Sequence, residues 1–115
     1  MSAIEVDSGI QVLATSVVTM PRLSGSRETA RCLAAGGPID AALIDCSAME
    51  ASSLSVAQEL IHQLVDLRGA RWVQLIEPTA FWSGRVRSQM EQRGMPDTLS
   101  IVPRTFPERW SLAAS

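Results

Sequence analysis

Ala41-Ala-Leu-Ile-Asp-Cys-Ser-Ala-Met-Glu-Ala-Ser-Ser-Leu54, with the run that follows it to Leu67, decides the fold of this chain. Four consecutive apolar residues over 41–44 predict a central strand that is covered on both faces. The strand ends at Asp45, and a short serine-bearing loop leads to the start of a helix. Because open α/β domains place their binding residues in loops after buried strands, this loop is the first candidate for a functional site.

The segment after this loop predicts the best-defined helix of the chain. Its apolar residues recur at the spacing of one helical face, namely at Ala57, Leu60, Ile61, Leu64 and Val65. Ser55 and Gln58 match a capping box, while Ser52 and Ser53 are alternative caps. Gly69 ends the predicted helix.

Towards the N-terminus, strand-like residues over 4–6 and from 10 to about 19 flank an Asp-Ser-Gly turn, which predicts a β-hairpin. Pro21 breaks the second strand because proline has no N–H to donate. Residues 24–35 then predict a helix that Ser24 or Ser26 caps. Its apolar stripe is formed by Ala30, Leu33 and Ala34, and residues 36–38, Gly-Gly-Pro, stop it.

Towards the C-terminus, the pattern predicts a strand over 72–76, a helix capped by Thr79 and ended by Gly94, a strand over 99–102 and a helix over 106–112. Strands that alternate with helices indicate a mostly parallel sheet. We therefore expect a small α/β domain in the order β-β-α-β-α-β-α-β-α, with a four- to five-stranded sheet that the opening hairpin makes mixed. The expected core consists of Leu43, Ile44, Leu60, Ile61, Leu64, Val73, Leu75 and Val86.

The composition suits a single globular domain, which we expect to span residues 1–115. Of these residues, 46% are hydrophobic, and the formal net charge is −2 without any basic block. Nucleic-acid binding needs clustered Lys or Arg, so nucleic acid is excluded as the main partner. Every basic residue is Arg, which excludes chemistry that depends on lysine.

The chain is expected to stay in the cytoplasm and to avoid membranes. No stretch approaches the ~20 consecutive apolar residues of a membrane-spanning helix. The N-terminus has no positive region ahead of an apolar stretch, as a signal peptide would. Cys32 and Cys46 lack metal-site spacing and are expected to be reduced thiols.

Signatures of common enzymes, phosphate-binding loops and zinc sites are absent, so we expect no catalysis, no metal and no cofactor. Cys46 follows a strand, where the nucleophile of a small thiol-dependent transferase would lie, but no Arg occurs between it and Arg68 to close an anion loop. A small buried thiol is therefore favoured. His62 is expected on the solvated face of its helix.

The tryptophans are interpreted mainly as core residues. Trp72 lies in a predicted strand and Trp82 on the apolar face of a predicted helix, and both are expected in the core. Trp110, near the C-terminus, is the tryptophan that we retain as a candidate for partner contact.

The hydroxyl groups of Ser52 and Ser53 are candidate phosphoacceptors. Phosphorylation would add about −1.5 to −2 charges at a helix N-terminus, where backbone N–H groups stabilise negative charge. The surface potential would change sharply without unfolding the domain. The alternative is that these serines only cap the helix.

The order of elements resembles the STAS domain, the family of anti-sigma-factor antagonists and their stressosome and transporter relatives. Two stretches of sequence also resemble this family. They are Ile44-Asp-Cys-Ser-Ala-Met-Glu-Ala-Ser-Ser-Leu54 and the later Arg68-Gly-Ala-Arg-Trp-Val73. The family pattern opens with Asp-Leu-Ser, which Asp45-Cys46-Ser47 resembles, and continues to Asp-Ser-Ser-Gly-Leu. Ser52-Ser53-Leu54 resembles the end of that pattern without its Gly, and Glu50 or Ala51 stands in place of its second Asp.

The resemblance implies a bacterial regulator of transcription that switches partners. Its expected partner is a protein, either an anti-sigma factor or a serine kinase of the histidine-kinase-like ATPase type; whether the chain forms a homodimer is left open. The implied contact residues are Asp45, Ser47 and Glu50, with Ser52 and Ser53 as the phosphoserine candidates. A near-neutral loop would dock, and a phosphorylated loop would be repelled.

A receiver-like or scaffolding module of a signalling assembly is the alternative from a different class. Residues 40–45 resemble the phosphoacceptor strand of response regulators, and residues 103–106 echo their Lys-Pro-Phe. However, the acidic pair that would bind Mg²⁺ and the Lys are missing. The order of strands distinguishes the two, because the first strand of a receiver lies in the centre of an all-parallel sheet.

Overall fold

The computed structural model describes residues 14–103, which form a parallel sheet with helices packed against it. The sheet has four strands, which lie in the order β2-β4-β6-β7. Every neighbouring pair is parallel. The strands are β2 (Thr15–Thr19), β4 (Ala41–Asp45), β6 (Trp72–Ile76) and β7 (Leu99–Val102). The α/β class and these four strands are confirmed. The antiparallel partner expected over 4–6 lies outside the described residues and stays a prediction.

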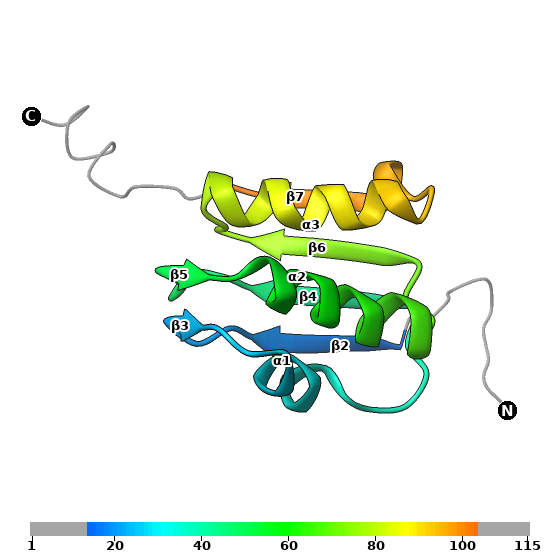
Figure 1. Cartoon of the computed structure of the whole chain (residues 1–115). Helices are drawn as coiled ribbons and strands as arrows, with labels where there is room; N and C mark the ends of the chain where they lie inside the picture. The colour runs from blue at the N-terminus through cyan, green and yellow to red at the C-terminus, as the bar shows by residue number, and fades with distance from the viewer. Residues whose placement is uncertain (1–13, 104–115) are drawn as a thin grey trace, which may run out of the picture.

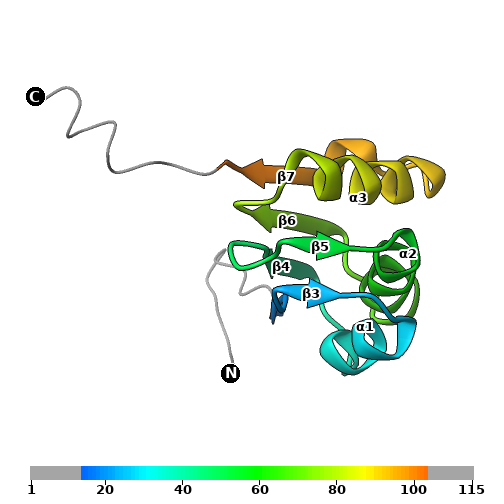
Figure 2. The ribbon, with the colours of Figure 1, turned by 60° about the vertical axis from the view of Figure 1, so that its left-hand side comes forward.

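The helices lie in a row on one face of the sheet (Figures 1 and 2). They are α1 (Arg27–Ala34), α2 (Leu54–Ile61) with its π-helical continuation η1 (His62–Leu67), and α3 (Ala80–Gln92). A short 3₁₀ helix, η2 (Pro96–Thr98), precedes β7. The strand order explains this arrangement: each crossover moves one position in the same direction, and right-handed crossovers of one direction place their helices on one face.

A second, two-stranded sheet was not predicted from the sequence. It consists of β3 (Leu23–Ser24) and β5 (Ala51–Ser52), which pair in parallel. The loop before α2 is therefore not a simple connection, since its second half is held as a strand against the segment that follows β2. Figure 1 shows this small sheet beyond the carboxyl ends of β2 and β4.

The core lies between the helices and one face of the sheet. Alternate strand residues are buried there, including Val18, Ile44, Val73 and Leu75. They pack with buried helix residues, namely Leu60, Ile61, Leu64, Trp82 and Val86. Except for Leu43, the predicted core is confirmed.

The expectation that 41–44 is covered on both faces was wrong for the described residues. In β4, buried and half-buried residues alternate, and Leu43 lies on the face opposite the helices. Trp72, expected in the core, shares that face and is 50% exposed. A purely apolar strand carries no alternation from which the covered face can be deduced, which explains both errors.

Caps fix the first residues of the three α-helices. Ser26 caps α1, Ser53 caps α2 and Thr79 caps α3, each through a side chain that accepts a backbone N–H of the first turn. The capping box expected at Ser55 and Gln58 was wrong, because both residues lie inside α2. Gly69 and Gly94 follow the helices as predicted and adopt positive φ angles of 82° and 71°.

One arginine ties the amino end of the sheet to the end of α1. The guanidinium of Arg68 donates from Nε to the carbonyl oxygen of Gly37 at 2.7 Å and from Nη1 to that of Ala34 at 2.8 Å. Nη1 also donates to Ser16 Oγ at 3.2 Å. A Cβ on Gly36 would lie 2.7 Å from Arg68 Cζ, so the close approach of this side chain requires glycine there. The helix expected over 106–112, with Trp110, lies outside the described residues.

Candidate functional site

The loop over 45–53, the contact loop, begins with a turn that Asp45 organises at the end of β4. The backbone N–H of Ser47 donates to Asp45 Oδ1 at 3.0 Å, and Ser47 Oγ donates to the same oxygen at 2.7 Å. These bonds, first from the backbone and then from the hydroxyl, lower the pKa of Asp45. Its carboxylate is therefore ionised at neutral pH. Asp45 and Ser47, two predicted contact residues, are brought together.

Glu50 connects the contact loop to the segment that precedes β3. Its backbone N–H donates to the carbonyl oxygen of Arg22 at 2.8 Å. Its carboxylate Oε1 lies 3.4 Å from Arg22 Nη1, with both side chains more than 60% exposed. A pair this exposed contributes little to stability, so Arg22 and Glu50 are free to exchange partners at the surface.

Ser53 performs a structural role. Its Oγ accepts the N–H of Val56 at 3.3 Å, donates to the carbonyl oxygen of Gly25 at 3.4 Å and lies 2.9 Å from Ser55 Oγ. The hydroxyl is thus occupied by the N-terminus of α2 and by the segment before α1. A phosphate on this oxygen would disrupt all three contacts.

Ser52 differs from its neighbour. It pairs in register with Ser24 through the backbone, and its side chain is half-buried. Within residues 14–103 the hydroxyl of Ser52 makes no hydrogen bond. Ser52 is also one of the residues that line a pocket of about 340 Å³. The two serines that the sequence could not separate therefore have different environments.

This pocket, the loop pocket, lies between the contact loop and the first turn of α3. Met49, Ala51, Phe81 and Trp82 form its apolar lining. Phe81 is 68% exposed, and the guanidinium of Arg85 lies over its ring at 4.3 Å from the centroid. Glu50, Ser52 and Thr79 contribute the polar groups. No sequence pattern predicted this pocket, because its walls come from segments about thirty residues apart.

Large apolar side chains are exposed around the loop pocket. Leu23 is 59% exposed and pairs in register with Ala51, while Leu54, the first residue of α2, is 46% exposed. Together with Phe81 they surround Ser52 with apolar surface. Exposed apolar groups that gather with a polar rim are typical of protein–protein contact sites.

The end of the sheet next to the pocket is acidic. Asp45 pairs in register with Ile76, which places Asp45 beside Glu77, the residue after β6. Among the described residues, neither carboxylate forms an ion pair. Glu77 also has a positive φ angle of 52°, which is uncommon for a residue other than glycine.

The thiol of Cys46 is fully buried and donates to the carbonyl oxygen of Ile44 at 3.3 Å. The prediction of a small buried thiol is confirmed. A transferase that uses Cys46 would need a sulfur open to solvent, and this sulfur is not.

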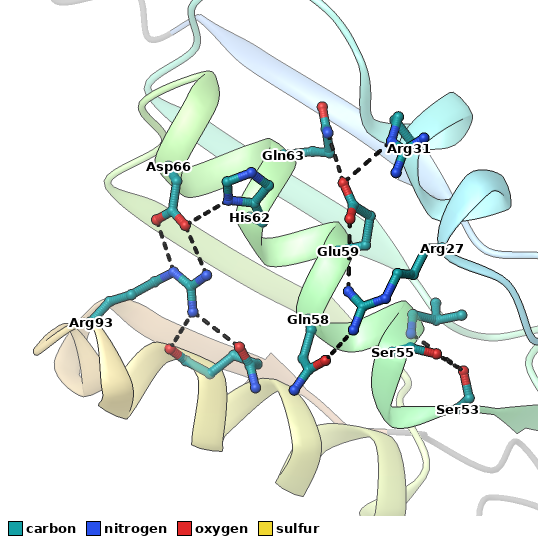
Figure 3. A network of polar contacts seen from close by, with 12 residues as sticks. Arg27, Arg31, Ser53, Ser55, Gln58, Glu59, His62, Gln63, Asp66 and Arg93 are labelled. Carbon is teal, nitrogen blue, oxygen red and sulfur yellow. Dashed lines mark hydrogen bonds and ion pairs between the residues drawn. The ribbon is translucent and has the colours of Figure 1, made fainter.

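A polar network covers the outer surface of the helices (Figure 3). Glu59 on α2 is 7% exposed and lies within 3.8 Å of Arg27 and 3.6 Å of Arg31, both on α1. A hydrogen bond from Gln63, the largest cause, lowers the pKa of Glu59. The network thus joins α1 to α2, and the sequence pattern did not reveal it.

His62 belongs to the second half of this network, on the exposed side of its helix as predicted. Its Nδ1 lies 3.0 Å from Asp66 Oδ2. Arg93, at the end of α3, donates to Asp66 from Nε at 2.9 Å and from Nη2 at 2.8 Å. This fork lowers the pKa of Asp66, with His62 adding to the effect. The cluster joins η1 to α3 and is a structural clamp.

Residues 14–103 contain neither a candidate metal site nor a candidate membrane-spanning helix. No cluster of three or more His, Cys, Asp or Glu side chains is arranged to hold a metal ion. No helix there has the length and apolarity to cross a membrane. Comparison of the sequence with protein-family models and curated proteins, and of the structure with solved structures, found no match.

Proposed function

We propose that this chain is a non-catalytic, STAS-like regulatory domain that binds a protein partner through the contact loop and releases it when Ser52 is phosphorylated. The single observation that supports this best is the contrast between the two serines. Within residues 14–103 the Ser52 hydroxyl makes no hydrogen bond, and Ser52 lines a pocket that exposed apolar side chains surround, whereas Ser53 caps α2. The partner is an anti-sigma factor or a serine kinase of the histidine-kinase-like ATPase type.

The position of Ser52 suits a switch. It lies two residues before Leu54, the first residue of α2, and its hydroxyl takes no part in the cap that Ser53 provides. A phosphate there adds about −1.5 to −2 charges to the wall of the pocket without removing that cap. The fold is retained while the charge of the docking surface changes, which is what partner release requires.

Two features favour this proposal over the receiver-like module. Within the described sheet β2 is an edge strand with β4 as its neighbour, whereas the first strand of a receiver lies between two others. The described helices also cover a single face, whereas doubly wound folds cover both.

The test begins with co-expression of the chain with a serine kinase of the histidine-kinase-like ATPase type, followed by mass spectrometry of the intact protein and its peptides. We expect one phosphate, on Ser52. In calorimetry with the same kinase or its anti-sigma relative, Ser52→Asp is expected to bind at least about tenfold more weakly, a loss of about 1.4 kcal/mol.

Ser53→Asp is the matched control, since Asp is as good an N-cap as Ser and adds the same charge one residue away. It is expected to retain binding within about threefold, or about 0.7 kcal/mol. Phosphate on Ser53 alone, or equal binding of both Asp variants and the wild-type chain, would contradict the proposal.

A further inference from the structure

The residues that line the loop pocket indicate which kind of chemical group it can bind. Its lining is apolar on both sides, with Met49 and Ala51 from the contact loop and Phe81 and Trp82 from α3. Binding energy at protein interfaces concentrates where a side chain enters such a pocket and is fully desolvated. The exposed Leu23 and Leu54 continue this apolar surface outside the pocket.

The charged residues beside the pocket indicate which charge a bound partner carries there. Asp45 and Glu77 are acidic and lack an ion pair within the described residues, and Glu50 lines the pocket itself. Two cations lie nearby, Arg22 at 3.4 Å from Glu50 and Arg85 over the ring of Phe81. The three carboxylates outnumber them, so the rim has a negative balance that favours positive charge in a partner.

From these two observations we infer that the loop pocket receives one large apolar side chain of the protein partner, flanked in the partner by Arg or Lys residues. The inference deepens the proposed function and rests on it. It also gives phosphorylation a local mechanism. Ser52 stands in the wall of the pocket, so a phosphate on its Oγ places a doubly charged, strongly hydrated group where the apolar side chain must be desolvated.

The probes for the test are short synthetic peptides with Leu, Ile, Met or Phe between Arg residues. Matched peptides carry Ala at the centre, or Glu in place of Arg. Binding to the full chain is followed by ¹⁵N–¹H NMR titration. We expect at least one apolar-centred Arg peptide to bind and to shift Ala51, Ser52 and Phe81. The Ala-centred and Glu-flanked peptides are expected to bind at least about tenfold more weakly.

Ala51→Phe tests the pocket directly, because Ala51 is an exposed strand residue of its wall, where a ring can fill the space without disturbing the core. This variant is expected to reduce peptide affinity by about tenfold or more. Ala35→Phe is the control: Ala35 is exposed at the end of α1 and belongs neither to the contact loop nor to the pocket. It is expected to change affinity by less than about twofold. The NMR spectra of both variants report that each is folded.

Three results would overturn the inference: no binding by any apolar-centred Arg peptide, unchanged affinity of Ala51→Phe, or chemical-shift changes that fall on the open sheet face around Val17 and Trp72.

The local mechanism is tested on the chain with phosphoserine incorporated at position 52, which is expected to lose the peptide. If phosphoserine releases the whole partner protein while Ala51→Phe still binds it, the proposed switch stands and the pocket fails. If Ala51→Phe loses the partner while phosphoserine does not, the pocket stands and the switch fails.

Discussion

At the scale of single residues, Ser52 and Ser53 show how neighbours with the same side chain acquire different roles. Ser53 turns its hydroxyl to the first turn of α2 and to Gly25, whereas Ser52 is held by backbone pairing and turns its hydroxyl to the pocket. Ser52 ends β5 and Ser53 follows it with an extended backbone, in which successive side chains point to opposite sides. A capping serine is a poor substrate for modification, because its oxygen already serves the fold.

This contrast predicts that substitution of the two serines lowers stability to different extents. Ser53→Ala removes the cap of α2 and is expected to lower the free energy of unfolding by about 1 kcal/mol. Ser52→Ala is expected to change it by less than about 0.5 kcal/mol. Urea denaturation followed by circular dichroism measures both. Equal losses in the two variants would contradict the assignment of the cap to Ser53.

Leu64 offers a test of the predicted core. Its side chain is fully buried in η1, so Leu64→Ala is expected to cost about 2–5 kcal/mol of unfolding free energy. Leu67, three residues further on in η1, is 62% exposed. Leu67→Ala is the matched control and should cost less than about 0.5 kcal/mol. A loss below about 1 kcal/mol for Leu64→Ala would mean that this helix face is not packed.

Residue-level predictions from the sequence succeeded where the pattern was periodic. The helical spacing of Leu60, Ile61 and Leu64 identified a buried stripe. Leu43 and Trp72 were misplaced because a strand of uniform hydrophobicity does not reveal which face meets the helices. That choice is made by the crossovers, which are a property of the whole sheet.

At the scale of elements, Arg68 connects parts of the fold that the sheet and helices alone would leave apart. Its guanidinium satisfies a carbonyl oxygen at the end of α1, that of Ala34, and another in the loop that follows, that of Gly37. Carbonyl groups at a helix end have no partner within the helix and favour a nearby cation. This side chain therefore acts as a C-terminal cap supplied from a distant segment.

Arg68→Met keeps most of the aliphatic stem and removes the donors, so it is expected to lower the free energy of unfolding by about 1–3 kcal/mol. Arg68→Lys is expected to recover little, since an ammonium group cannot reproduce the fork. The control is Arg71→Met, whose side chain is 66% exposed and lies 3.5 Å from Asp40. It should change stability by less than about 1 kcal/mol. Chemical denaturation of the variants measures these differences, and full rescue by Lys would contradict the geometry.

Element boundaries were predictable where a cap or a glycine marked them, as at Thr79, Gly69 and Gly94. The parallel pair of β3 and β5 was not, because two-residue strands have no period to detect. The π-helical turn was also missed, since the apolar spacing over 57–65 fits an ordinary α-helix. The contact loop was singled out from the sequence, but the pocket residues Phe81 and Trp82 were not. The difference between Ser52 and Ser53 was not predicted either, because it depends on β5.

At the scale of the whole molecule, folding favours the ionised form of three carboxyl groups. Hydrogen bonds from Ser47, Gln63 and Arg93 lower the pKa values of Asp45, Glu59 and Asp66, in that order. The unfolded chain therefore binds more protons than the folded chain in acid. Their contribution is present above the ordinary pKa values and is lost as the pH falls through the lowered ones.

We therefore expect the free energy of unfolding to fall as the pH is lowered from about 5 to about 2. Asp66→Asn is expected to make this fall shallower, because the variant has no carboxylate to protonate beside Arg93. Glu91→Gln, on the exposed surface of α3, serves as the control for loss of one negative charge. Thermal melts across the pH range measure the slopes, and identical slopes for Asp66→Asn and the wild-type chain would contradict the clamp.

The sequential order β2-β4-β6-β7 has a consequence for how the chain is made. The ribosome releases these strands in the order in which they stand side by side, so each new strand meets an edge that its predecessor has just formed. No strand has to be inserted between two others, and each helix can pack as soon as its crossover closes. The described sheet can thus assemble during translation from β2 towards β7, and the last strand to emerge, β7, stays an edge of that sheet.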